Sequence, residues 1–143
     1  MSTRAQIVIL DEDIDYLGSL TYKKALEHYA HTMIYVHCDG YPEGLGVDLE
    51  NYLKLDGVRI HDVEYFSAHI IGYISGYDRK HYESSKDFTG YGICKEFHGD
   101  LSYYYVIDLY KKKLSCIDTY DGLVYEKTFE EIRGEKDNGM CTS

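Results

Sequence analysis

Residues 114–127 read LSCIDTYDGLVYEK, two runs rich in apolar and aromatic side chains on either side of Asp121-Gly122. An Asp-Gly pair between two such runs favours a two-residue type I′ turn, so this stretch predicts a β-hairpin. Just before it, residues 103–109 alternate with period two, and the two sets of side chains differ only modestly in polarity. The last third of the chain therefore predicts antiparallel strands.

The first half of the chain predicts strands and helices in alternation. Apolar runs at residues 3–10 and 33–37 have the composition of strands. Apolar residues at helical spacing predict three helices, over residues 20–31, 43–54 and 62–75. Thr128 and Glu131 match a capping box, which predicts a short closing helix that Gly134 ends. The polar residues 77–90 predict a loop.

These elements predict an α+β domain with a mostly antiparallel sheet of about five strands and two to three helices packed on one face. A chain of 143 residues is the size of one domain. We therefore expect a single domain over residues 1–134. The small, polar residues 135–143 are expected to form a flexible C-terminal tail.

Composition excludes several classes of protein. The formal charge of −10 opposes direct nucleic-acid binding, because affinity for phosphate backbones comes mainly from Lys and Arg. No apolar run approaches the length of a membrane span, and the first residues do not resemble a signal peptide. The cysteines are widely spaced and contain no C-x-x-C pair, which favours free thiols in a reducing compartment. We expect a cytoplasmic protein that does not bind membranes.

The most distinctive segment is residues 35–46, which read YVHCDGYPEGLG. Pro42 is the only proline of the chain, and it predicts a turn between a strand and a helix, because its ring fixes φ and it has no N–H. With the preceding Ser2-Thr3-Arg4, this motif resembles a family of small proteins encoded mainly by bacteriophages and prophages. The resemblance implies no particular activity, and it places the protein in a host cytoplasm. In the family a short turn joins the first strand to the motif strand, whereas residues 11–32 intervene here.

Two His-x-Asp pairs are the candidates for chemistry. We expect His37 and Asp39, two residues apart near a strand end, to point to the same side. His98 and Asp100 form the second pair, and we expect their turn to lie near the first one. Together the four side chains would suit a divalent transition metal or acid–base catalysis, with His37, Asp39 and Asp100 in catalytic roles. The structural alternative is that Asp39 caps the turn and His37 is an ordinary strand residue.

Tyrosine is the compositional outlier, with 17 residues. Its ring is a large apolar surface with a polar tip, a combination that is frequent at binding interfaces. Packing at the rim of the sheet is the alternative explanation. The residues that we expect to contact a ligand or partner are Tyr35, His37, Asp39, Tyr41, Glu43, Tyr103 and Tyr105.

Two functions from different classes remain open. The favoured one is a non-enzymatic binding protein of phage type that acts on a host protein or sequesters a small ligand, with no cofactor. The alternative is a small metal-dependent hydrolase or nucleotide-processing enzyme built on the turn at His37 and Asp39. Exposed tyrosine-rich strands also allow a homodimer.

Overall fold

The computed structural model describes residues 3–14, 21–75 and 90–134. This part of the chain forms six strands, β1 (Ala5–Leu10), β2 (Thr32–Val36), β3 (Tyr91–Cys94), β4 (Tyr103–Asp108), β5 (Lys113–Asp118) and β6 (Gly122–Thr128). Its helices are α1 (Tyr22–Tyr29), α2 (Val47–Leu53), α3 (Val63–Ser75) and a short closing helix over residues 129–134. One π-helical turn, η1 (Pro42–Gly46), leads directly into α2.

The strands form one sheet in the order β3-β2-β1-β4-β5-β6. All neighbours are antiparallel except β1 and β4, which lie parallel at the centre with Ala5 opposite Tyr103. The α+β class is therefore confirmed, and the sheet is mixed. The parallel pair arises because β1 and β4 are joined by a long crossover that contains two strands and three helices.

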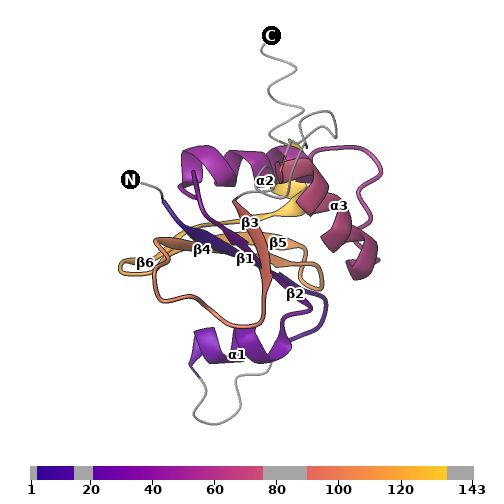
Figure 1. Cartoon of the computed structure of the whole chain (residues 1–143). Helices are drawn as coiled ribbons and strands as arrows, with labels where there is room; N and C mark the ends of the chain where they lie inside the picture. The colour runs from indigo at the N-terminus through magenta and orange to yellow at the C-terminus, as the bar shows by residue number, and fades with distance from the viewer. Residues whose placement is uncertain (1–2, 15–20, 76–89, 135–143) are drawn as a thin grey trace, which may run out of the picture.

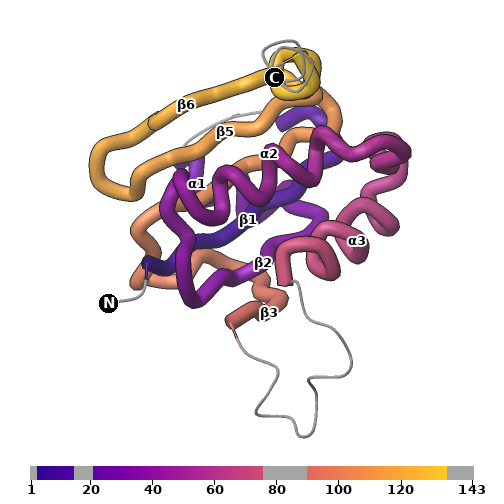
Figure 2. Tube along the Cα trace, turned by 90° about the horizontal axis from the view of Figure 1, so that it is seen from above, coloured from indigo at the N-terminus to yellow at the C-terminus, as the bar shows by residue number. Residues whose placement is uncertain are grey.

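Helices cover both faces of the sheet (Figure 1). The larger core lies under α2, α3 and the closing helix, where Leu49, Phe66 and Ile132 pack on the central strands. Seen from above, α2 and α3 lie across the same face of the sheet (Figure 2). The smaller core lies on the opposite face, where Leu26 of α1 packs near Val8. We expected the helices on one face, and α1 departs from that because β1 is buried on both faces and needs a second cover.

The hairpin predicted at Asp121-Gly122 is present, but its turn is longer than two residues. Asp118 pairs with Gly122, so three residues connect β5 to β6. The carboxylate of Asp118 accepts hydrogen bonds from the N–H groups of Tyr120 and Asp121, and Gly122 has a φ of 91°. The side-chain cap on this turn replaces the type I′ geometry that the Asp-Gly pair favours.

Hydroxyl side chains cap α1 and the closing helix. The hydroxyl of Thr21 accepts a hydrogen bond from the N–H of Lys24 at the start of α1. The capping box of the closing helix is complete, with Thr128 N–H donating to Glu131 and Glu131 N–H donating to Thr128. The predicted loop at residues 77–90 and the predicted tail at residues 135–143 lie almost entirely outside the described residues. Within the described residues, no helix is both long and apolar enough to cross a bilayer.

Candidate functional site

The distinctive motif forms a sharp corner between β2 and α2 at one end of the sheet. Asp39 has a left-handed backbone conformation, with a φ of 59°, and its carbonyl oxygen accepts a hydrogen bond from Leu45 N–H at 2.9 Å. Gly40 N–H donates to the carbonyl oxygen of Thr3, beside the start of β1. The corner is therefore fixed by backbone hydrogen bonds at both of its ends.

Gly40 lies where only a glycine fits. A Cβ at this position would be 2.6 Å from the Cβ of Ala5. The carbonyl oxygen of Gly40 accepts a hydrogen bond of 2.7 Å from the hydroxyl of Tyr105. The side chain of Tyr105 is completely buried. Tyr105 was expected to contact a partner, but it supports the corner from inside the core. Tyr103 is half-buried and packs against the same core.

The outer side of the corner faces solvent. His37, Asp39, Tyr41 and Glu43 are all exposed, and Tyr35 is half-buried. Tyr41 donates a long hydrogen bond of 3.4 Å to the carboxylate of Asp39. These five of the residues that we expect to bind a partner are therefore accessible at the surface.

His37 and Asp39 do not share a side, so our expectation for this pair is wrong. The strand ends at Val36, and the positive φ at Asp39 breaks the alternation that would have aligned them. The His37 ring lies near the ring of Tyr35, with their centroids 6.4 Å apart. Asp39 instead lines a cavity on the other face, together with Val36 and Leu45.

This cavity, which we call the corner cavity, has a volume of about 390 Å³. Val36, Leu45 and Tyr91 form its apolar side, and its charged groups are the carboxylates of Asp39 and Asp48. Partial burial of Asp48, together with the charge of Asp39, raises the pKa of the Asp48 carboxyl. Both carboxylates line the same cavity, so the charge of Asp39 acts on Asp48.

Among the described residues, no cation forms an ion pair with Asp39 or Asp48. In the part of the chain that the structure describes, the ion pairs of Lys and Arg go to other acids. Tyr91 adds its ring to the cavity, and its hydroxyl donates to the carbonyl oxygen of Ile74. Burial, and then the charges of Asp48 and Asp39, raise the pKa of Tyr91, so this phenol stays neutral. The corner cavity is thus negatively charged with an apolar wall.

The second His-x-Asp pair lies on the α1 face, in a cluster around Tyr35, whose ring also neighbours His37. Asp100 accepts from the hydroxyl of Tyr35 at 3.1 Å and pairs with Arg4 at 3.1 Å. The ring of His98 stacks on Tyr35, with centroids 4.2 Å apart and planes at 31°. Burial, and then the hydrogen bond to Asp100, raise the pKa of Tyr35. Asp100 is therefore already satisfied by two partners.

The four predicted metal ligands do not form one site. Asp39 lies in the corner cavity, whereas Asp100 is held by Arg4 and Tyr35 on the other face. Among residues 3–14, 21–75 and 90–134, no group of three His, Cys, Asp or Glu side chains could hold a metal ion.

Sequence reasoning missed Gln6, which holds the second cluster in place. This side chain is completely buried in β1. Its amide oxygen accepts from His98 N–H at 2.8 Å, and its amide nitrogen donates to the carbonyl oxygen of Glu96 and to the sulfur of Cys94. A glutamine inside the apolar run of β1 was the available signal, because a buried amide must be paired.

The exposed thiol of the corner, Cys38, also lines the corner cavity. The other two cysteines in the described ranges are less accessible, and burial raises the pKa of Cys94 and raises that of Cys116 to about 11. A raised pKa keeps a thiol protonated and unreactive. Neither Cys94 nor Cys116 is therefore activated as a nucleophile.

Comparison of the chain with protein-family models, with curated proteins and with solved structures found no match. The resemblance of the motif to phage-encoded proteins thus stays a prediction.

Proposed function

We propose that this chain is a small, non-enzymatic binding protein of phage type that acts in the host cytoplasm on a host protein. In this proposal the corner cavity receives a basic side chain of the partner, and the exposed face of the corner contacts the surrounding surface. The observation that carries the proposal is the pair of carboxylates, Asp39 and Asp48, in one cavity with an apolar wall, where no Lys or Arg of residues 3–14, 21–75 and 90–134 lines the cavity.

The cavity has the chemistry that a lysine or arginine side chain needs. Such a side chain is an apolar stem with a charged head. Val36, Leu45 and Tyr91 offer apolar surface to the stem, and Asp39 and Asp48 offer two acceptors to the head. A guanidinium can donate to two carboxylates at once, which favours arginine.

The rest of the surface supports a basic partner. The chain carries a formal charge of −10, which attracts positively charged partners over a distance and raises their association rate. Tyr41 and Glu43 lie on the outer side of the same corner and are exposed. They supply an aromatic and an acidic contact next to the cavity.

A matched pair of peptides tests this proposal. The probes are Ac-Gly-Ile-Arg-Ile-Gly-NH2 and the same peptide with Gln in place of Arg, titrated into the protein by calorimetry at low and at high salt. We expect the Arg peptide to bind at least about tenfold more tightly at low salt, and the difference to shrink at high salt.

The variant Asp39→Asn/Asp48→Asn should lose the preference for the Arg peptide, whereas the exposed control Asp121→Asn should keep it. Capture from a host lysate then identifies the partner as the protein that the wild type retains and the double variant does not. Equal binding of the two peptides to the wild type, or an unchanged preference in the double variant, would contradict the proposal. Tight binding of a small amine in place of any protein would assign the cavity to ligand sequestration.

A further inference from the structure

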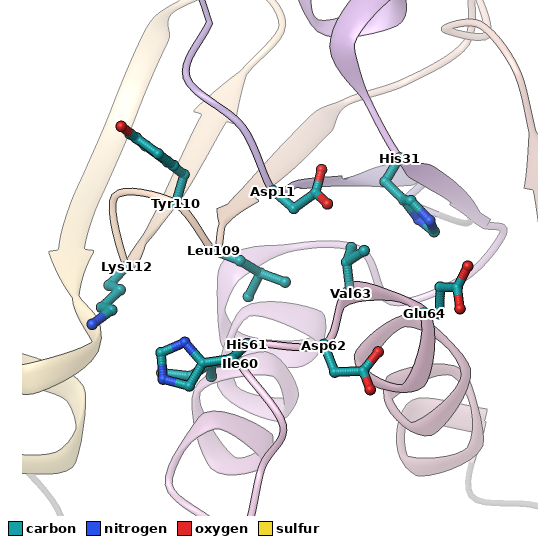
Figure 3. Close-up of a pocket in the computed structure, with 10 residues that line it drawn as sticks. All are labelled: Asp11, His31, Ile60, His61, Asp62, Val63, Glu64, Leu109, Tyr110 and Lys112. Atoms are coloured by element: carbon teal, nitrogen blue, oxygen red, sulfur yellow. The ribbon is translucent and has the colours of Figure 1, made fainter.

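A second cavity lies at the other end of β1, where the central parallel strands finish (Figure 3). Its volume is about 700 Å³, within the range of sites that bind small molecules. Residues from four places line it: the end of β1, the start of β2, the segment that enters α3, and the turn after β4. We call it the β1–β4 pocket.

Groups of both charges line this pocket. Lys112 and His61 lie on one side of it in Figure 3, Glu64 and His31 lie on the other side, and Asp11 lies between the two sides. Within residues 3–14, 21–75 and 90–134, the ion pairs leave Lys112, Glu64 and Asp11 without an opposite charge. Their charges are therefore free to meet a ligand.

Neighbouring charged residues, by contrast, are already paired. Asp62 also lines the pocket, but it pairs with Arg59 at 3.3 Å and accepts a hydrogen bond from Tyr65 N–H in the first turn of α3. Lys111, next to Lys112, pairs with Asp13. The contrast gives a matched control, because Lys111 and Lys112 differ in their partners and not in their chemistry.

An apolar surface separates the two charged sides. Leu109 and Val63 lie between Lys112 and Glu64 in Figure 3, and Ile60 adds to the same lining. A ligand that fits this order has an anionic group at one end, an apolar middle, and a cationic group at the other end. Such a lining suits a zwitterion with its two charges at opposite ends.

We infer that the β1–β4 pocket binds a short peptide of about three residues with free termini and an apolar central side chain. A sphere with the volume of the pocket is about 11 Å across, and an extended tripeptide spans roughly 10 Å, whereas a free amino acid holds its charges only about 3 Å apart. The carboxylate of the peptide meets Lys112 and His61, and its ammonium meets Glu64 and Asp11. This site is separate from the corner cavity and independent of the function proposed for it.

Four versions of one tripeptide test the inference. Gly-Leu-Gly is titrated with both termini free, with an acetylated N-terminus, with an amidated C-terminus, and with both ends blocked. We expect the free peptide to bind, and each blocked end to weaken binding by about tenfold. No binding of the free peptide, or equal binding of all four peptides, would overturn the inference.

Two variants assign each terminus to its partner. In Lys112→Gln the amidated peptide should bind as well as the free one, and in Glu64→Gln the acetylated peptide should bind as well as the free one. The control Lys111→Gln should keep both differences. All three side chains are exposed, and an unchanged melting temperature verifies that the variants fold. Variants that retain both differences would show that the peptide binds elsewhere, which also rejects the inference.

Discussion

At the scale of single residues, the corner depends on the absence of a side chain at Gly40. A Cβ there would be 2.6 Å from the Cβ of Ala5 and 3.0 Å from the carbonyl oxygen of Thr3, so the backbone must move to accept it. We predict that Gly40→Ala lowers the free energy of unfolding by about 1–3 kcal/mol, the usual range for overpacking. Urea denaturation measures this change.

Gly72 is the matched control for this substitution. It lies in α3 with nothing within 4 Å of an added Cβ. Alanine is a better helix former than glycine, so Gly72→Ala should raise the free energy of unfolding by about 0.5–1 kcal/mol. A Gly40→Ala protein as stable as the wild type would mean that the corner is not packed against β1.

Tyr105 supports the same corner, and its phenol makes the folded protein less stable at alkaline pH. Burial raises the pKa of this phenol above the ordinary value of 10.0. Its neutral form is therefore favoured in the folded state, and this contribution is complete below pH 10 and is lost as the pH rises further. The variant Tyr105→Phe should lose about 1 kcal/mol at neutral pH, from the hydrogen bond to Gly40.

The measurement for Tyr105 is the free energy of unfolding against pH for the wild type and Tyr105→Phe. We expect the difference between them to shrink as the pH rises above 10. Tyr120, which is 89% exposed, gives the control Tyr120→Phe, which should match the wild type throughout. A difference that stays constant with pH would contradict the assignment of the raised pKa to Tyr105.

At the scale of elements, the closing helix depends on its capping box. The N–H and hydroxyl groups of Thr128 lower the pKa of Glu131 below its usual 4.5. This stabilisation is present above pH 4.5 and is lost as the pH falls through the lowered value. Thr128→Ala should cost about 1 kcal/mol at neutral pH, as the loss of a helix cap does.

An NMR titration of Glu131 checks the same cap. In Thr128→Ala its pKa should rise toward 4.5, because the hydroxyl no longer hydrogen-bonds with this residue. The exposed control Glu130→Gln should leave the pKa of Glu131 close to its wild-type value. An unchanged pKa in Thr128→Ala would show that the hydroxyl does not stabilise the charged form.

Local signals in the sequence predict most of the elements. The apolar spacing of α3, the lone proline before α2 and the capping box each act within a few residues, so they can be read directly. The parallel pairing of β1 and β4 depends on contacts nearly a hundred residues apart, which no local pattern encodes. β3 was missed because its four residues include a glycine and are largely exposed, so they carry no alternation.

The candidate site was predicted in part, for similar reasons. The motif correctly indicates a strand-to-helix corner, because proline and glycine act on their own backbone. The motif does not reveal that Asp39 shares a cavity with Asp48, because η1 and the start of α2 bring the two residues together. The motif also does not reveal that the side chains of His37 and Asp39 lie on different sides. The positive φ of Asp39 breaks the alternation of side chains that an extended strand would give.

At the scale of the whole molecule, the two cavities lie at opposite ends of β1. The corner cavity is lined by residues after the end of β2, and the β1–β4 pocket begins at Asp11 after the end of β1. β1 is completely buried along its length and joins the two ends rigidly. The described residues thus hold two separate cavities, one at each end of the central strand.

The central claim is that the corner cavity receives a cationic side chain, and the pKa of Asp48 tests it most directly. Burial and the charge of Asp39 raise this pKa above 3.8 in the free protein. A guanidinium bound beside the two carboxylates favours their charged forms. In an NMR titration we predict that the pKa of Asp48 falls when the Arg peptide is bound and stays unchanged with the Gln peptide. A pKa that does not move while the Arg peptide is bound would contradict the account.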